Sequence, residues 1–557
     1  MKKEYVKIGI VLVLFILAVC LSLYGLGTPT PQPSSAAEDV FSAERAIKHV
    51  KAIAQRPHPT GSVENIKVRD YIVTQLRELG LEPEINKYGQ IHNVLAVMEG
   101  SNHIEDSGKI FIVSHYDSVP EGPGASDDGV AVAAMLESLR ALKDLPPLKN
   151  DIVFLFTDGE EIGLRGARAF MDNNPLADDI ALVLNLEARG TGGPSIMFET
   201  SVNNGRLIQE FAKAVPYPVA NSLSYEIYSR MPNDTDLTVF KDAGFPGLNF
   251  AFIFEGMNYH TKFDNIENVD MGSLQHHGSY TLSLLKHFAN MDLANTNFNS
   301  PNHIYFDIMG QFLIHYPVSW AIPILVVVTA LFTYYIFINK KENLISIKNI
   351  GLSLIYIFST IAIVFLINSI VRPLGIHILK GIDTVYNIYP YNLFLNYLYY
   401  SDIFLTVFTL VTVGITLICW LVFRKIFKIT NDTTNLLSTT LLIWLILGGI
   451  LTIIIPGASY LFIIPLLLTL GLYLIMDLIK IFTNMDINKY FITASILMFI
   501  GIFFIFPMIY LINQAMGMNI IVPAMVLAVL PLLPVVPIAV GRRELSTELN
   551  EESPKSM

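Results

Sequence analysis

Hydrophobic residues are distributed unevenly along the 557-residue chain. Residues 27 to about 300 mix apolar and charged positions throughout, whereas residues 315–540 are almost continuously apolar. A membrane-spanning helix needs ~20 consecutive, mainly apolar residues, and a soluble domain needs charged residues on its surface. The pattern therefore predicts a soluble domain followed by an all-α, polytopic transmembrane domain.

Eight apolar runs are long enough to cross a bilayer. The first, Ile8–Leu26, exceeds the ~7–15 apolar residues of a signal-peptide core, so we interpret it as an uncleaved anchor, with a cleaved signal as the alternative. The aromatic segment Tyr386–Tyr400, interrupted by Pro390, is interpreted as interfacial, although it could hold a ninth span. The other seven runs are residues 317–338, 350–371, 402–423, 437–455, 458–478, 490–512 and 519–540.

Lysine and arginine gather in alternate loops between these runs. Cytoplasmic loops are enriched in these two residues, and the longer loop after the third run is a partial exception, with Arg372 and Lys380. We expect both termini on the cytoplasmic side and residues 27–315 on the extracytoplasmic or lumenal side. The basic residues that support this orientation are Lys2, Lys3, Lys7, Lys340, Lys341, Lys348, Arg424, Lys425, Lys428, Lys480, Lys489, Arg542 and Arg543.

Strands and helices alternate in the soluble part. Amphipathic helices are predicted at residues 41–54 and 64–79, and apolar strands at residues 93–98, 109–114, 151–156, 180–187 and 247–253. This alternation favours an α/β fold with a mixed, mostly parallel sheet flanked by helices. The predicted organisation is a cytoplasmic N-terminus (1–7), an anchor (8–26), a Pro/Ser linker (27–40), an extracytoplasmic domain (41–300), a transmembrane domain of about seven helices (315–540) and a cytoplasmic tail (541–557).

The amino-acid composition limits which kinds of molecule the protein can bind. The net charge of −11 argues against nucleic acid, because phosphate binding needs a basic face. Cys20 and Cys419 both lie in apolar runs, so we expect neither a disulfide framework nor a cysteine metal cluster. Membrane lipid is the partner that the apolar runs imply.

Metal-binding side chains follow four of the predicted strands. Ligands of α/β sheets lie at the carboxyl ends of strands. Zinc accepts histidine nitrogen and carboxylate oxygen, and two zincs ~3.5–4 Å apart need a bridging ligand and terminal ligands on both sides. A free carboxylate beside them could take a proton from water. The residues concerned are His115, Asp117, Asp127, Asp128, Asp158, Glu160, Glu161, Glu187, Tyr259 and His260.

Five motifs in order, SHYDS, GASDDG, DGEEIGLRGA, NLEARG and YHTKFDN, resemble those of family 28 of the metallopeptidases, the co-catalytic zinc aminopeptidases. RPHPTGSVENIKVRDY and NLEARGTGGPSIMFET are similar to the multi-spanning vacuolar and endoplasmic-reticulum membrane proteases of that family. The resemblance implies the zinc aminopeptidase fold, two zinc ions, a peptide substrate and amide hydrolysis, most simply as an aminopeptidase.

The resemblance also implies the metal ligands. His115 and Glu187 would bind one zinc, Glu161 and His260 would bind the other, and Asp127 would bridge the two ions. Glu187 departs from the aspartate of many soluble members.

Further roles follow from the same resemblance. Glu160 would be the general base on the metal-bridging water. Asp117 would orient the first metal-binding histidine, and Asp236 would orient the second. Tyr259 is a candidate hydrogen-bond donor to the oxyanion, or alternatively a packed aromatic residue. The Asp127–Asp128 peptide bond would be cis.

Several alternatives remain at this point. The domain could be a catalytically inactive peptidase-like receptor or scaffold, the regulatory outer part of a transporter, or an aminoacyl cyclase of the same family. Arg189 could contact a substrate carboxylate, as a carboxypeptidase requires, or form a structural ion pair. His276 and His277 lack carboxylates at a useful spacing, so we assign them surface or structural roles.

Overall fold

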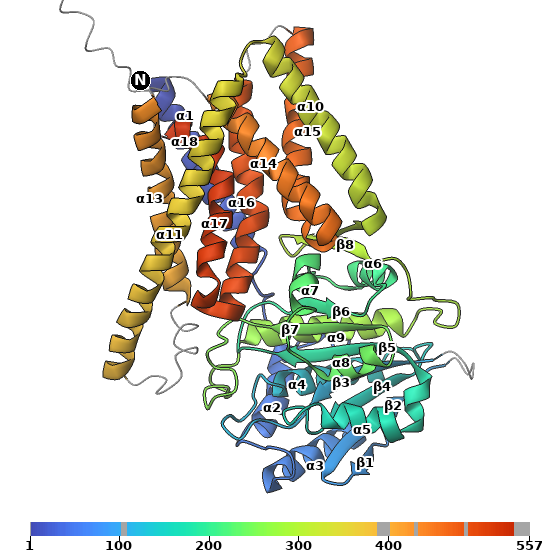
Figure 1. Cartoon of the computed structure of the whole chain (residues 1–557). Coiled ribbons are helices and arrows are strands. Elements are labelled where there is room, and N and C mark those ends of the chain that lie inside the picture. Colours follow the sequence, from blue (N-terminus) through green and yellow to red (C-terminus); the bar gives the residue numbers. More distant parts are fainter. Residues whose placement is uncertain (1, 102–107, 387–400, 428–432, 484–487, 540–557) are drawn as a thin grey trace, which may run out of the picture.

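The computed structural model describes residues 2–101, 108–386, 401–427, 433–483 and 488–539. An α/β domain lies at one end of a bundle of long apolar helices, and the N-terminus lies at the opposite end of that bundle (Figure 1). The structure thus contains both the predicted α/β domain and the predicted helical domain.

The α/β domain is built on a seven-stranded sheet with the strand order β1-β2-β4-β3-β5-β7-β6. The four central strands, β4, β3, β5 and β7, pair in parallel, and the three outer pairings are antiparallel. The predicted mixed α/β sheet is confirmed, with its parallel part at the centre. The strands are β1 (Glu84–Tyr88), β2 (Ile91–Met98), β3 (Lys109–His115), β4 (Ile152–Thr157), β5 (Ile180–Ala188), β6 (Ile196–Thr200) and β7 (Gly247–Phe252).

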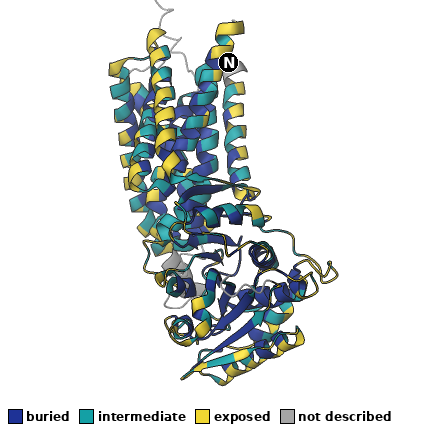
Figure 2. Cartoon of the chain, turned by 90° about the vertical axis from the view of Figure 1, so that its right-hand side faces the viewer, coloured by how far each residue is buried: buried dark blue, intermediate teal, exposed yellow. Residues whose placement is uncertain are grey.

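Helices cover both faces of this sheet, which explains why the central strands are continuously apolar. Along β3, Ile110 and Ile112 join the core under one set of helices, and Phe111 and Val113 join the core on the opposite face. Figure 2 shows the buried strands between exposed outer surfaces. The first set is α2 (Ala43–Ile53), α3 (Val63–Glu78), α4 (Gly129–Lys143), α6 (Gly205–Ala214) and α9 (Met271–Phe288), and the second is α5 (Arg165–Asn173) and α8 (Asp236–Asp242).

Eight helices in the described part of the chain are long and apolar enough to cross a membrane, as the sequence predicts. The third span is longer than predicted, because α11 continues past Pro373 to Tyr386. The rest of the segment predicted as interfacial, and the tail from residue 541, lie outside the described residues. The bundle consists of α1 (Lys2–Tyr24), α10 (Ala321–Lys341), α11 (Ile347–Tyr386), α13 (Ser401–Phe427), α14 (Thr433–Ile454), α15 (Tyr460–Thr483), α16 (Lys489–Met516) and an eighth span made of α17 (Ile521–Leu532) and α18 (Val536–Ala539).

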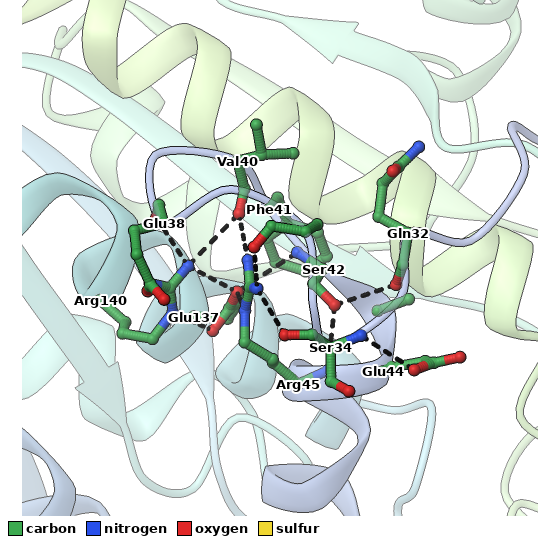
Figure 3. Close-up of polar contacts among 12 residues, drawn as sticks. Gln32, Ser34, Glu38, Val40, Phe41, Ser42, Glu44, Arg45, Glu137 and Arg140 are labelled. Carbon is green, nitrogen blue, oxygen red and sulfur yellow. Dashed lines mark hydrogen bonds and ion pairs between the residues drawn. The ribbon is translucent and has the colours of Figure 1, made fainter.

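The Pro/Ser segment after α1 is held against the α/β domain (Figure 3). Arg45 donates hydrogen bonds to the carbonyl groups of Ser34 at 3.0 Å and Ala36 at 2.9 Å. Arg140 donates to the carbonyl group of Glu38 at 2.9 Å. Both arginines pair at 2.7 Å with the carboxylate of Glu137, which is 1% exposed. The segment predicted as a linker therefore packs on α2 and α4.

The α/β domain also contacts the helix bundle directly. A short helix, α7 (Ser222–Tyr228), and a hairpin of β8 (His303–Ile308) and β9 (Phe312–Pro317) lie between the two parts (Figure 1). The Ser222 hydroxyl donates a hydrogen bond to the carbonyl group of Gly457, between α14 and α15, at 2.6 Å. A second contact is an apolar cluster that includes Ile196 of β6 and Leu511 of α16.

Candidate metal centre

Four parallel strands bring the predicted residues to one edge of the sheet. His115 is the last residue of β3 and pairs in register with Thr157, the last residue of β4. The two adjacent glutamates follow β4, and Glu187 lies near the end of β5. His260 follows β7. Because carboxyl ends of parallel strands meet at the same edge, residues far apart in sequence become neighbours.

Asp127 lies between the two histidines. Its Oδ1 atom is 3.2 Å from Nε2 of His115, and its Oδ2 atom is 3.1 Å from Nε2 of His260. Each histidine also faces a glutamate: Glu187 Oε2 is 3.9 Å from His115 Nε2, and Glu161 Oε2 is 3.0 Å from His260 Nε2. The structure brings together all five residues predicted as ligands, as two histidine–glutamate pairs that share one aspartate.

The loop that carries Asp127 is fixed by a residue that the sequence analysis did not single out. The Asp264 carboxylate accepts hydrogen bonds from the backbone N–H groups of Ser126 at 2.7 Å and Asp127 at 3.1 Å. Asp264 belongs to the YHTKFDN motif, so its place in that motif was the available signal. The Asp127–Asp128 peptide bond is cis, as expected. Asp128 accepts a hydrogen bond from the Ser114 hydroxyl at 2.6 Å.

Asp117 contacts both the first histidine and the glutamate pair. Nδ1 of His115 is 2.9 Å from the Asp117 carbonyl oxygen and 3.5 Å from its carboxylate. The carboxylate accepts hydrogen bonds from the backbone N–H groups of Glu160 at 3.1 Å and Glu161 at 3.3 Å. Asp117 thus lies where it was predicted, but its carbonyl group makes the closer contact with the ring and its carboxylate positions the next strand's loop.

Asp236 lies elsewhere than predicted. It is the first residue of α8, and its carboxylate accepts a hydrogen bond from the Thr157 hydroxyl rather than facing His260. Burial, the main cause, raises the pKa of Asp236 to about 6, and the hydrogen bond from Thr157 opposes this rise. Asp236 therefore supports the end of β4, and the prediction that it orients His260 is wrong.

Tyr259 stacks on the second histidine. Its ring centroid lies 3.8 Å from that of His260, and the Arg189 guanidinium lies 6.0 Å from the Tyr259 ring centroid. Burial, reinforced by the charges of Asp127 and Glu161, raises the pKa of the phenol far above its ordinary value. The hydroxyl group therefore stays protonated and can donate a hydrogen bond.

The site concentrates negative charge. Burial, together with the charges of Asp236 and Glu161, raises the pKa of Glu160 well above its ordinary value. Burial and the charge of Glu160 act in the same direction on the pKa of Glu187. Burial alone would lower the pKa of His260, but its hydrogen bonds to Asp127 and Glu161 raise that pKa to about 10. Carboxylates this close to one another favour a bound cation.

The donor set fits zinc. Glu161 Oε1 is buried without a hydrogen-bond partner, which is costly for a polar atom unless another group binds it. Ligand atoms of His115, Asp127 and Glu161 lie within 4.8 Å of one another, as do those of His115, Asp128 and Glu187. Imidazole and carboxylate are ligands that zinc accepts. Asp128 thus also lies close to His115 and Glu187, the proposed ligands of one metal.

The comparisons with known proteins agree with this chemistry. The sequence pattern of Peptidase family M28 matches residues 93–285. Endoplasmic reticulum metallopeptidase 1 of Mus musculus is 32% identical over an alignment of 310 residues that covers 50% of this chain and 34% of the relative. A vacuolar membrane protease of Candida tropicalis is 32% identical over an alignment of 278 residues that covers 47% of this chain and 30% of the relative. The chain spans about a third of the length of these relatives.

Solved structures align at lower similarity. The aminopeptidase from Aneurinibacillus sp. strain AM-1 aligns with a TM-score of 0.37 and 14% identity, over 45% of this chain and 95% of that one. A zinc aminopeptidase from Bacillus subtilis aligns with a TM-score of 0.37 and 15% identity, over 47% of this chain and 98% of that one.

The fold and the site define a metallopeptidase-type α/β domain carried by a membrane protein. More specifically, residues 93–285 match Peptidase family M28, and the chain is similar to endoplasmic reticulum metallopeptidase 1 and to a vacuolar membrane protease. The resemblance seen in the motifs is therefore confirmed.

Proposed function

We propose that this chain is a membrane-anchored zinc metallopeptidase that hydrolyses peptide bonds with two zinc ions. The observation that carries this proposal is the position of Asp127, whose two carboxylate oxygens face two different histidines at 3.2 and 3.1 Å. Such a residue can bridge two metals, and a glutamate beside each histidine supplies a further ligand on each side.

His115 and Glu187 would hold one ion and His260 and Glu161 the other, with Asp127 shared between them. Zinc bound there supplies Lewis-acid polarisation of the scissile carbonyl group and lowers the pKa of the attacking water toward ~7. The chain's own task is to fix these ligands, and Asp117 and Asp264 do so through backbone hydrogen bonds on either side.

Glu160 is the proposed general base. Its carboxylate lines the same cavity as Asp127 and Glu187, and its neighbour Glu161 is the one that faces His260. Glu160 would accept a proton from the attacking water and return it to the leaving amine. Tyr259, whose hydroxyl group stays protonated, would donate a hydrogen bond to the oxygen of the scissile carbonyl group.

We further propose that the enzyme is an aminopeptidase. Three ligand carboxylates and Glu160 nearly cancel the charge of two zinc ions, so little positive charge remains to attract a substrate carboxylate. A substrate ammonium group could instead lie against Glu160 or Glu187. Arg189 also lines the cavity, and it is the residue through which a carboxypeptidase would bind a C-terminus.

The test uses the full chain in detergent with zinc and one peptide in free, N-acetylated and C-amidated forms. We expect the free and amidated forms to lose residues from the N-terminus and the acetylated form to survive. Loss of the C-terminal residue, or internal cleavage of the acetylated form, would contradict the aminopeptidase assignment. The Glu160→Gln variant controls for contaminating peptidases, and no turnover by the wild-type protein would contradict the enzymatic function itself.

The membrane orientation is part of the proposal. We propose that residues 41–300 lie on the extracytoplasmic or lumenal side and that both termini are cytoplasmic. The position of the α/β domain at one end of the bundle, with the N-terminus and α18 at the other, supports this arrangement (Figure 1).

A further inference from the structure

A single cavity joins the candidate metal centre to the helix bundle. Its volume is about 170 Å³, and Glu160 and Glu187 line its polar end. A membrane helix forms part of its far wall, close to where α16 meets the α/β domain (Figure 1). The four residues of α16 that line the cavity are Leu511, Ile512, Ala515 and Met516.

The wall between the two ends is mainly apolar. Ile196 and Phe198 of β6, Ile227 of α7 and Ile253 after β7 line it. With the side chains of α16, they form an apolar compartment next to the candidate ligands, and the charged residues that line the cavity besides those acids are Arg189 and Asp234. A substrate group that enters this compartment exchanges water for hydrocarbon, which favours apolar groups and disfavours charged ones.

The last turns of α16 are fixed relative to the metal ligands. The ring of Tyr510 packs edge-on against Phe254, with 5.4 Å between ring centroids. The backbone N–H of Phe254 donates to the Gly192 carbonyl group at 2.9 Å, and the Gly192 N–H donates back at 3.1 Å. Gly193 has φ +90, and a Cβ atom there would lie 2.5 Å from the Phe254 ring. This loop directly follows the strand that carries Glu187, so α16 and the ligand share one support.

We propose that the last turns of α16 form the subsite for a large apolar side chain on the substrate residue that precedes the scissile bond. The inference deepens the proposed peptidase function and rests on it. Substrates with leucine, methionine or phenylalanine at their N-terminus fit a compartment of this volume and polarity. The membrane domain then determines specificity as well as anchoring the enzyme.

The first test compares kcat/KM for aminoacyl-methylcoumarin reporters of phenylalanine, alanine and glutamate. In the wild-type protein we expect phenylalanine to exceed alanine roughly tenfold or more, and glutamate to be poorest. Ala515→Leu fills the compartment and should lower the phenylalanine-to-alanine ratio roughly tenfold. Ala330→Leu makes the same change on the exposed surface of α10 and should leave the ratio unchanged.

The second test measures binding without turnover, in a Glu160→Gln chain that also carries Cys20→Ser and Cys419→Ser. Maleimide labelling of Ala515→Cys should slow when Phe-Ala amide is added and should not slow with the same concentration of Ala-Ala amide. Labelling of Ala330→Cys should respond to neither peptide. Equal protection by both peptides, or protection by neither, would overturn the subsite.

The two tests separate this inference from the function on which it rests. If the wild-type protein hydrolyses the alanine reporter and Ala515→Leu leaves the ratio unchanged, the subsite is wrong and the peptidase function stands. If no reporter is hydrolysed, the proposed function fails, and selective protection by Phe-Ala amide still supports an apolar binding compartment at α16.

Discussion

The Asp117 carboxylate accepts a hydrogen bond from the backbone N–H of Glu160 at 3.1 Å, although the two residues follow different strands of the sheet. The same carboxylate accepts from the next N–H, that of Glu161, and the Asp117 carbonyl group contacts the ring of His115. One residue thus sets the position of a proposed ligand on each metal and of the proposed base.

Replacing Asp117 with asparagine tests this arrangement. The amide keeps the size of the side chain but removes the charge and one acceptor, so the glutamate loop loses part of its support. We expect zinc affinity or kcat/KM to fall ~10–100-fold, the usual effect of losing such a supporting residue. Zinc affinity is measured by chelator competition. Asp172→Asn, on the exposed surface of α5, should change neither quantity.

The two adjacent glutamates should separate metal binding from proton transfer. Glu160→Gln should lower turnover by orders of magnitude and retain both zinc ions, because its carboxylate is the proposed base and not a ligand. Glu161→Gln should lose zinc, since its carboxylate faces His260 at 3.0 Å. Zinc content by elemental analysis, together with kcat, checks both. Near-normal activity of Glu160→Gln would rule out its role as base.

Replacing Asp127 should weaken zinc binding more than replacing Asp264, which only supports the loop that carries Asp127. Asp127→Asn should lose zinc from the whole site, because both histidine–glutamate pairs depend on it. Asp264→Asn should weaken zinc binding ~10–100-fold without removing a ligand, because only the loop's hydrogen bonds change. Titration of each variant with zinc gives both affinities. Equal zinc affinities of the two variants would contradict the bridging role of Asp127.

Stability should fall in mild acid because of His276, a buried histidine that is not one of the candidate ligands. His276 accepts a hydrogen bond from the Ser195 N–H at 3.2 Å and contacts the Tyr217 carbonyl group at 2.9 Å. Burial lowers the pKa of His276 to about 4. An unfolded histidine has a pKa of about 6.5, so below that pH the unfolded chain binds a proton that the folded chain rejects. The contribution of His276 to folding stability is fully present above pH ~6.5 and is lost as the pH falls toward 4.

The lowering of the His276 pKa on folding corresponds to about 3 kcal/mol of folding free energy. Melting temperatures of the protein in detergent with excess chelator, measured between pH 7 and 4, report this loss without a contribution from metal release. His276→Gln keeps polar atoms near both partners and removes the titrating group. The variant should therefore lose less stability over this range, and an unchanged slope would show that other groups dominate.

Membrane orientation can be tested with single cysteines at exposed, described positions. Val202 is 70% exposed in the α/β domain, and Leu344 is 45% exposed between α10 and α11. In a Cys20→Ser, Cys419→Ser chain expressed in intact cells, an impermeant thiol reagent should label Val202→Cys and not Leu344→Cys. Both should react after permeabilisation. The reverse pattern would invert the proposed topology.

The sequence predicted the central sheet, and the gathering of the candidate ligands at one edge of it, for physical reasons. Buried parallel strands are continuous apolar runs, and their carboxyl ends carry the site. The two edge strands were missed, because β1 (EINKY) is largely polar and β6 (IMFET) is short. Asp236 was misplaced because spacing along the chain does not reveal which strand end a helix will face.

Other features needed the three-dimensional arrangement. Asp264 acts through backbone N–H groups of a loop that lies 137 residues away in sequence, which no residue pattern encodes. Leu511 and Ala515 look like ordinary lipid-facing residues of an apolar run. Their position in the same cavity as the candidate ligands follows only from how the bundle and the sheet meet.

The segment that Arg45 and Arg140 hold against the α/β domain has a consequence for how the protein meets its substrates. A free flexible chain of that length would let the domain wander roughly 20 Å from its anchor. Here the segment is bound along the domain, and Tyr510 of α16 packs against Phe254 of the domain. The α/β domain is therefore held in place relative to the helix bundle. Under the proposed function, the cavity therefore stays at a fixed distance from the helix bundle, and peptides must diffuse to it, which favours those already concentrated at the membrane surface.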